Sequence, residues 1–179
     1  RLSTISTGLI VPSKFFELAK EGKDFFMFAP HTVEKEYGVT LDDINIDEYY
    51  DQLVENPNIM KKSKDAREML NMIAQTQLQS GYPYLMFKDN ANRVHANSNI
   101  GQIKMSNLCT EIFQLQETSV INDYGIEDEI KRDISCNLGS LNIVNVMESQ
   151  KFRDSVHTGM DALTVVSDEA NIQNAPGVK

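Results

Sequence analysis

The chain has 179 residues, of which 41% are hydrophobic and 24% charged, and its formal net charge is −9. This composition is typical of a globular domain that is long enough to bury a core. The acidic excess argues against direct binding to nucleic acid or to an anionic membrane. The longest apolar runs are too short to span a bilayer, and no signal peptide is visible.

Residues 1–87 predict strands that alternate with helices. Pro12-Ser13 is expected to cap the first helix, and Gly22 and Gly81 each follow a helical pattern that they are expected to end. Met69 and Ile73 recur at helical spacing, which indicates core packing rather than a cofactor site. The predicted elements are a strand at 2–11, a helix at 14–21, a strand at 24–29, a helical turn at 32–38, helices at 47–55 and 64–80, and a strand at 84–87.

The second half of the chain contains fewer regular patterns. The polar stretch 88–99 predicts a long loop with a turn or two of helix. Strands are predicted at 102–115 and 133–138, and the acidic residues 127–133 predict a solvated connector. An apolar stripe predicts a last helix at 152–172. Strands that alternate with helices indicate an α/β fold, which we expect to be a single unit over residues 1–179.

Three chemically capable side chains occupy every second position of the predicted strand 102–115. They are Asn107, Cys109 and Glu111. Side chains two apart on a strand point to the same face, so the spacing predicts an amide, a thiol and a carboxylate in one row. The spacing also fits one helical turn, but the flanking apolar and β-branched residues favour a strand. The plain alternative is a buried, inert cysteine beside a solvated glutamate.

This row favours radical chemistry at Cys109 over ionic chemistry. A carboxylate beside a cysteine disfavours the thiolate by like-charge repulsion, and an ionic nucleophile needs the thiolate. A thiol that donates a hydrogen atom needs no thiolate. A nucleophilic Cys–His pair would need a histidine that is close in space, because none is close in the sequence.

Cys136 is the second cysteine, and two interpretations of it stay open. It is either a buried packing residue or a redox thiol that acts with a third cysteine outside this sequence. A disulfide with Cys109 is sterically feasible across adjacent strands, but two cysteines in this length do not make a secreted scaffold. We therefore expect reduced thiols and a cytoplasmic location. The scattered histidines and the lack of a Cys-x-x-Cys motif predict no metal site.

The segments 106–112 and 136–142 together resemble the catalytic barrel of the ribonucleotide reductase large subunit, most closely its bacterial class Ib form. They read Ser-Asn-Leu-Cys-Thr-Glu-Ile and Cys-Asn-Leu-Gly-Ser-Leu-Asn, and segments 28–31 and 80–84 are supporting matches. The resemblance implies part of a ten-stranded α/β barrel made of two antiparallel halves, incomplete in this chain.

The resemblance implies a role for each residue of the two motifs. Cys109 matches the cysteine that becomes a thiyl radical and takes hydrogen from the 3′ carbon of the ribose. Glu111 matches the base that accepts the 3′-hydroxyl proton, and Asn107 the amide that hydrogen-bonds the ribose. Leu108 and Thr110 would belong to the same substrate-contacting segment. Cys136 matches one half of a dithiol in the family. That dithiol is oxidised to a disulfide as the 2′-hydroxyl leaves as water.

The resemblance also implies partners. The substrates would be ribonucleoside diphosphates, which are reduced to deoxyribonucleotides for DNA synthesis. A metal-containing small (beta) subunit would supply the radical, a glutaredoxin- or thioredoxin-like protein would supply the dithiol reductant, and nucleotide effectors would regulate a full-length homodimer. The second redox cysteine, the relay tyrosines and the tail cysteines would lie outside this sequence, so we expect the isolated chain to be an inactive fragment.

Two other classes of protein fit the same residues. One is a different thiyl- or glycyl-radical enzyme built on a related barrel. The other is a non-enzymatic α/β binding module in which both cysteines are merely buried.

Overall fold

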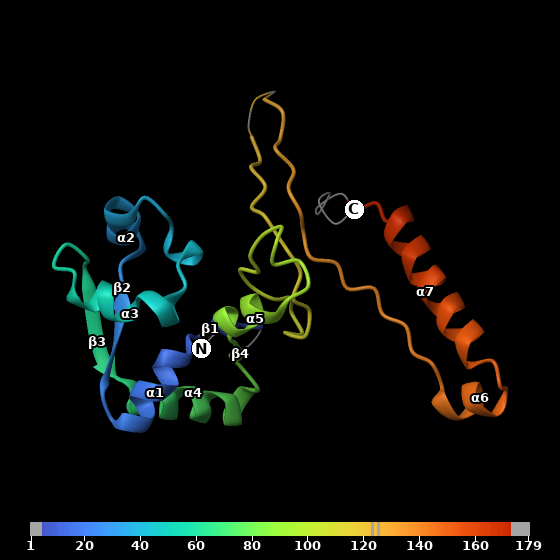
Figure 1. The fold of residues 1–179 in the computed structure, drawn as a ribbon, viewed down its shortest axis with the longest axis horizontal. Coiled ribbons are helices and arrows are strands. Elements are labelled where there is room, and N and C mark those ends of the chain that lie inside the picture. Colours follow the sequence, from blue (N-terminus) through green and yellow to red (C-terminus); the bar gives the residue numbers. More distant parts are fainter. Residues whose placement is uncertain (1–4, 123, 125, 173–179) are drawn as a thin grey trace. The chain divides into compact units, whose positions relative to one another are not determined.

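Two units divide the chain, Arg1–Gln114 and Leu115–Lys179. The structure is a computed structural model that describes residues 5–122, 124 and 126–172. The strands labelled in Figure 1 all belong to the first unit, and the second unit contains α6 and α7. Whether residues 1–179 act as one barrel fragment without an internal boundary stays a prediction.

The first unit alternates strands with helices, as the sequence predicts. A glycine with positive φ follows α1, α2 and α4, and these are the positions at which the helices were expected to end. Its elements are β1 (Gly8–Ile10), α1 (Ser13–Glu21), β2 (Asp24–Phe28), α2 (Pro30–Tyr37), the short 3-10 helix η1 (Leu41–Asp43), α3 (Ile46–Glu55), β3 (Lys61–Asp65), α4 (Ala66–Ser80), β4 (Tyr84–Met86) and α5 (Lys88–Val94).

The four described strands form two separate two-stranded sheets. β1 pairs with β4 in parallel, so that Gly8 lies opposite Tyr84, and residues far apart in the sequence become neighbours. β2 pairs with β3 in antiparallel register, with Asp24 opposite Asp65. The alternation of strands and helices confirms the α/β class. Among the described residues no closed barrel is present, so the ten-stranded barrel is not confirmed.

Aromatic and aliphatic side chains form two core clusters in the first unit. In the first, Phe15 meets Phe25 edge-on with ring centroids 5.2 Å apart, and Phe25 stacks on Tyr50 at 5.4 Å. The backbone N–H of Phe26 donates a hydrogen bond of 2.7 Å to the Tyr50 hydroxyl, which ties α3 to β2. The second cluster contains Val33, Ile44, Leu53 and Ile59. The apolar stripe of α4 packs against the first cluster, as expected from its helical spacing.

The start of α1 is capped by a residue distant in the sequence. Pro12 makes no side-chain capping hydrogen bond. Instead, the backbone N–H groups of Ser13 and Lys14 donate to the Asp47 carboxylate at 3.0 and 2.8 Å. Free N–H groups at a helix start favour a negative charge, so this contact stabilises α1 and fixes it to α3.

Leu53→Ala should destabilise the fold strongly, because Leu53 is fully buried in the second core cluster. Buried leucine-to-alanine changes cost about 2–5 kcal/mol through lost burial and the cavity they leave. Leu78→Ala is a matched control, since Leu78 lies on a helix but is 90% exposed, and exposed changes cost within about 0.5 kcal/mol. Urea unfolding followed by circular dichroism measures both, and equal midpoints would contradict the assigned core.

The second unit contains α6 (Ile143–Glu148) and α7 (Phe152–Glu169). The Asn142 side chain accepts a hydrogen bond from the backbone N–H of Asn145 at 3.1 Å and so begins α6. The α7 helix was expected, and α6 was not. In the described part of this unit, an isolated antiparallel bridge joins Val120 to Glu129. No helix among the described residues is both long and apolar enough to cross a membrane.

Four predictions about elements are wrong. Neither 102–115 nor 133–138 is a strand, because the structure gives both segments an irregular path. The first strand, predicted at 2–11, is short, Gly8–Ile10, and residues 2–4 of the prediction lie outside the described residues. The helix predicted at 64–80 begins only at Ala66, because residues 61–65 form β3. This lysine-rich segment is extended because its backbone pairs with β2, which a local pattern cannot show.

Candidate active site

The segment that contains Asn107, Cys109 and Glu111 is a turn rather than a strand. The Thr110 N–H donates to the Asn107 carbonyl at 3.2 Å, and Thr110 has a φ of 76°. The left-handed conformation of Thr110 breaks the alternation of side chains that an extended chain has. The prediction that Asn107, Cys109 and Glu111 share one face of a strand is therefore wrong. The Ser106 hydroxyl donates to the Ile112 carbonyl at 2.7 Å and closes the loop at its base. We call residues 106–112 the cysteine loop.

An asparagine on α5 holds the chain that leads into the cysteine loop. The Asn92 amide accepts from the Ile103 N–H at 2.7 Å and donates to the Ile103 carbonyl at 2.8 Å. Ile103 is fully buried, and Lys104 forms an ion pair of 2.9 Å with Asp43. That pairing lowers the pKa of Asp43, with a smaller contribution from Thr40. The loop therefore projects from an anchored segment.

The thiol at the turn is exposed. Cys109 is free, Leu108 is 69% exposed and Glu111 is exposed. The alternative in which Cys109 is a small buried hydrophobe therefore finds no support in this structure. An exposed thiol beside an amide and a carboxylate is accessible to a reactant.

A pocket of about 500 Å³ lies between the cysteine loop and the β1–β4 sheet. The loop contributes Asn107, Leu108 and Thr110, and the sheet contributes Tyr84 and Met86. The lining combines hydroxyl and amide side chains with apolar ones, and such a mixture suits a polar ring such as a sugar. The remaining lining residues are Ser6, Thr7, Gly8, Leu9, Ile10, Met105 and Ser106.

Tyr84 is electrostatically linked to the cysteine loop. A hydrogen bond with Tyr82 is the largest cause that raises the pKa of Tyr84, and the charges of Cys109 and Glu111 raise it further. The phenol therefore lies within electrostatic reach of both loop residues and stays neutral over the physiological pH range.

Cys136 lies in the second unit, where it is free and exposed. Its neighbour Asn137 donates a hydrogen bond of 2.7 Å to the hydroxyl of Ser167 on α7. Gly139 approaches Leu163 of the same helix, and a Cβ at this position would contact that side chain at 3.7 Å. These contacts fix the second motif against α7. Its proposed redox role stays a prediction.

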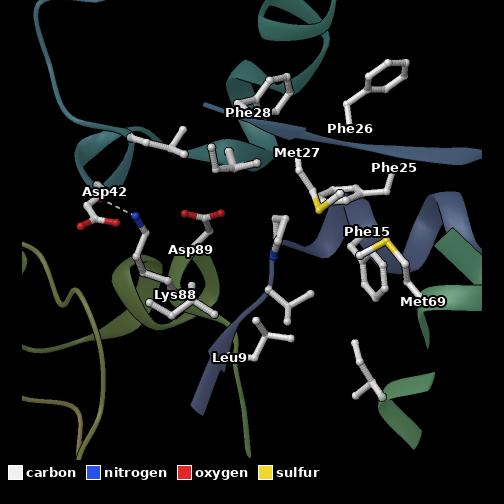
Figure 2. Close-up of a pocket in the computed structure, with 16 residues that line it drawn as sticks. Leu9, Phe15, Phe25, Phe26, Met27, Phe28, Asp42, Met69, Lys88 and Asp89 are labelled. Carbon is white, nitrogen blue, oxygen red and sulfur yellow. Dashed lines mark hydrogen bonds between the residues drawn. The ribbon is translucent and has the colours of Figure 1, made fainter. Parts of the chain in front are cut away.

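A second pocket, of about 340 Å³, is chemically different (Figure 2). Phe15, Phe25 and Met69 gather on one side of it, and Lys88 and Asp89 lie on the other. Lys88 is buried and donates to the Asp42 carbonyl, while burial raises the pKa of the Asp89 carboxyl. None of the predicted site residues lines this pocket, so the cysteine loop remains the candidate active site.

The sequence alone did not select the pocket residues Ser6, Thr7 and Tyr84. In the sequence, Tyr84 stood out only as part of the supporting match 80–84. In the structure, Thr7 contacts it through the backbone, since the Tyr84 N–H donates to the Thr7 carbonyl at 2.9 Å. The parallel pairing of β1 with β4 creates this neighbourhood, and a single segment carries no signal for it.

Comparison with known proteins identifies the family of this α/β chain. The family model of the ribonucleotide reductase barrel domain matches residues 1–179, and the chain belongs to this family. The chain is 48% identical over 179 residues to the ribonucleoside-diphosphate reductase subunit alpha of Bacillus subtilis (strain 168), covering 100% of this chain and 26% of that protein.

Other relatives bear the same name. The chain is 39% identical over 180 residues to the ribonucleoside-diphosphate reductase subunit alpha of Mycoplasma pneumoniae, covering 100% of this chain and 25% of that protein. It is 27% identical over 177 residues to the subunit alpha of Treponema pallidum (strain Nichols), covering 88% of this chain and 21% of that protein. The chain thus spans about a quarter of the length of the first relatives it matches.

Proposed function

We propose that this chain is the part of a ribonucleoside-diphosphate reductase catalytic subunit that carries the radical thiol, and that the full-length protein makes deoxyribonucleotides for DNA synthesis. The observation that carries the proposal is the exposed Cys109 between Asn107 and Glu111 on a closed, anchored loop, which also contributes Asn107 and Thr110 to a neighbouring pocket. Family membership and the names of the relatives support it.

The proposed reaction begins at Cys109. A thiyl radical there takes the hydrogen atom from the ribose 3′ carbon, which re-forms the S–H bond and leaves a carbon radical. Glu111 accepts the 3′-hydroxyl proton as general base, and Asn107 orients the ribose by hydrogen bonding. Leu108 and Thr110 contact the substrate within the same loop. Asn107, Leu108 and Thr110 line the pocket, and Cys109 and Glu111 are exposed on the same loop.

The second half of the reaction needs two electrons. The 2′-hydroxyl leaves as water, and a dithiol supplies two electrons and two hydrogens as it closes to a disulfide. Cys136 is one half of that dithiol, and its partner is a further cysteine of the full-length protein. The hydrogen taken from the 3′ carbon then returns from Cys109, which restores the thiyl radical. A glutaredoxin- or thioredoxin-like protein reduces the disulfide after each turnover.

The proposal includes partners that this chain does not contain. A metal-containing small subunit supplies the radical, nucleotide effectors regulate the full-length protein, and that protein is a homodimer in the cytoplasm. The isolated chain is inactive under this proposal. The names of the relatives support the nucleotide substrates and the two-subunit organisation.

Glu111→Gln in the full-length protein should lower turnover while substrate binding persists. Glutamine keeps the shape and a hydrogen bond but cannot accept the proton, and general bases contribute about 10²- to 10⁴-fold in rate. Steady-state reduction of ribonucleoside diphosphates, with the radical subunit present, measures the loss. Glu68→Gln, on the exposed surface of α4, is the matched control and should keep full activity. Equal losses in both variants would make the role of Glu111 structural.

A further inference from the structure

The Asn92 side chain of α5 makes three hydrogen bonds, two of them to a single residue. Its amide oxygen accepts from the Ile103 N–H at 2.7 Å, and its amide nitrogen donates to the Ile103 carbonyl at 2.8 Å. The same nitrogen donates to the Lys88 carbonyl, one turn back on α5, at 3.1 Å. An amide that is engaged at its oxygen and at its nitrogen has one orientation, so Asn92 holds Ile103 at two points.

The backbone of Ile103 depends on this pairing. Ile103 is fully buried, and residues 101–106 belong to neither a helix nor a strand of the described structure. Buried backbone groups that lose their partners cost free energy, and here the Asn92 side chain supplies what a neighbouring strand would otherwise supply. A side-chain amide suits this task, because it carries a neutral donor and an acceptor side by side.

The contact at Ile103 lies close to the thiol along the chain. Residues 103–105, which we call the stem, lead directly into the cysteine loop. The Ser106 hydroxyl closes that loop at its base by donating to the Ile112 carbonyl at 2.7 Å. A closed loop moves as a unit, so the place of Cys109 depends on how firmly the stem is held.

A second contact to the stem is weaker. The ion pair of Lys104 with Asp43 has a length of 2.9 Å, but the two side chains are 39% and 43% exposed. Ion pairs this exposed contribute little, and salt screens them. The bonds of Asn92 reach a buried residue, where water competes less. Asn92 is therefore the stronger of the two contacts.

We infer that Asn92 is a positioning residue for the proposed reaction, whose amide fixes the stem and so holds the Cys109 thiol where hydrogen transfer can occur. This inference rests on the proposed function, because Asn92 acts through Cys109. A misplacement of about 1 Å, even from a change far from the reacting atoms, can cost about 10²-fold in rate. Asn92 does not line the pocket beside the cysteine loop, so it should affect the rate more than substrate binding.

The experiment uses the full-length protein with its radical subunit and a ribonucleoside diphosphate. Asn92→Ala should lower kcat by about 10- to 100-fold, with KM changed by less than about threefold. In the same variant, amide hydrogen exchange should become at least about tenfold faster in residues 103–112 and stay unchanged in α1 and β2. Asn90→Ala is the matched control, since Asn90 is exposed on the same helix, and it should keep wild-type kcat.

Two further variants separate the hydrogen bonds from side-chain size and from the ion pair. Asn92→Asp keeps the size and the acceptor, but it lacks the N–H donors and places a carboxylate against the Ile103 and Lys88 carbonyls. It should lower kcat at least about tenfold. Lys104→Met removes the ion pair with Asp43 and should lower kcat by less than about fivefold.

One measurement needs no variant, so it does not depend on whether substitutions at position 92 fold. In the wild-type protein, the Ile103 amide should exchange at least about 100-fold more slowly than the Leu108 amide. The reason is that Asn92 accepts from the Ile103 N–H, whereas Leu108 lies on the exposed part of the cysteine loop.

Several results would overturn the inference. Equal exchange of the Ile103 and Leu108 amides, wild-type kcat in either Asn92 variant, or faster exchange spread over the whole first unit would each do so. A loss in Lys104→Met as large as that in Asn92→Ala would do so too, because the ion pair would then hold the stem equally well. If Cys109→Ser is inactive while Asn92→Ala keeps wild-type turnover, only the role of Asn92 fails. If Cys109→Ser keeps wild-type turnover, the proposed function fails as well.

Discussion

Cys109→Ser in the full-length protein is expected to abolish nucleotide reduction. The S–H bond is weaker than an O–H bond, so a serine at this position cannot exchange a hydrogen atom with the ribose 3′ carbon at a useful rate. Serine is close to cysteine in size, and residue 109 lies exposed at a turn, so the fold should persist. The assay is deoxyribonucleotide formation with the radical subunit, the substrate and a dithiol reductant present.

The expected loss at Cys109 exceeds that at any other position of the loop. Thr110→Ser is a suitable control within the turn, because it keeps the hydroxyl and removes one methyl group. This variant should retain most of the turnover. Cys109→Ser turnover near that of the control would remove the radical assignment.

Cys136→Ser is expected to give a different failure from that of Cys109→Ser. The substrate radical can still form, but the dithiol that reduces the 2′ position is incomplete. The substrate should then be consumed with release of its base and inactivation of the enzyme, rather than with clean reduction. Chromatography of free base and deoxyribonucleotide over time distinguishes the two outcomes.

The two cysteine variants therefore test separate steps of the proposed reaction, namely hydrogen abstraction at the 3′ carbon and reduction at the 2′ carbon. Sustained turnover of Cys136→Ser with a dithiol reductant would show that Cys136 is an ordinary surface residue. Free base released by Cys109→Ser would show that the radical forms elsewhere.

The sequence predicts those elements whose signals are local. Gly22, Gly38 and Gly81 follow helices α1, α2 and α4 with positive φ, as their positions indicate. The apolar stripe of α4 packs on the core for the same reason, because a helical period records one buried face. The site residues of the cysteine loop could be selected from the motif, since it is a continuous stretch of chain.

The remaining features depend on contacts between distant segments. The lysine-rich β3 is a strand because β2 pairs with it, and the cap of α1 comes from Asp47 on α3. The residues around Cys109 have strand-like composition, but Thr110 adopts a left-handed conformation and the segment folds into a turn. Propensity describes a residue's fit to a sheet and cannot supply the paired neighbour that a strand needs.

Tyr84 illustrates the same limit at the site. Its part in the pocket follows from the parallel pairing of β1 with β4, which brings position 84 next to position 8. Hydroxyl-bearing residues in two distant segments give no local pattern. Only the fold shows that they share a pocket with the cysteine loop.

The central claim is that Cys109 takes the hydrogen atom from the ribose 3′ carbon, and one isotope measurement tests it most directly. The full-length protein would reduce a mixture of ordinary and 3′-deuterated ribonucleoside diphosphate, and the isotope ratio of the remaining substrate would be followed by mass spectrometry. The account predicts enrichment of the deuterated substrate, with deuterium retained at the 3′ carbon of the product. An unchanged isotope ratio in the substrate, or loss of deuterium from the product on every turnover, would contradict it.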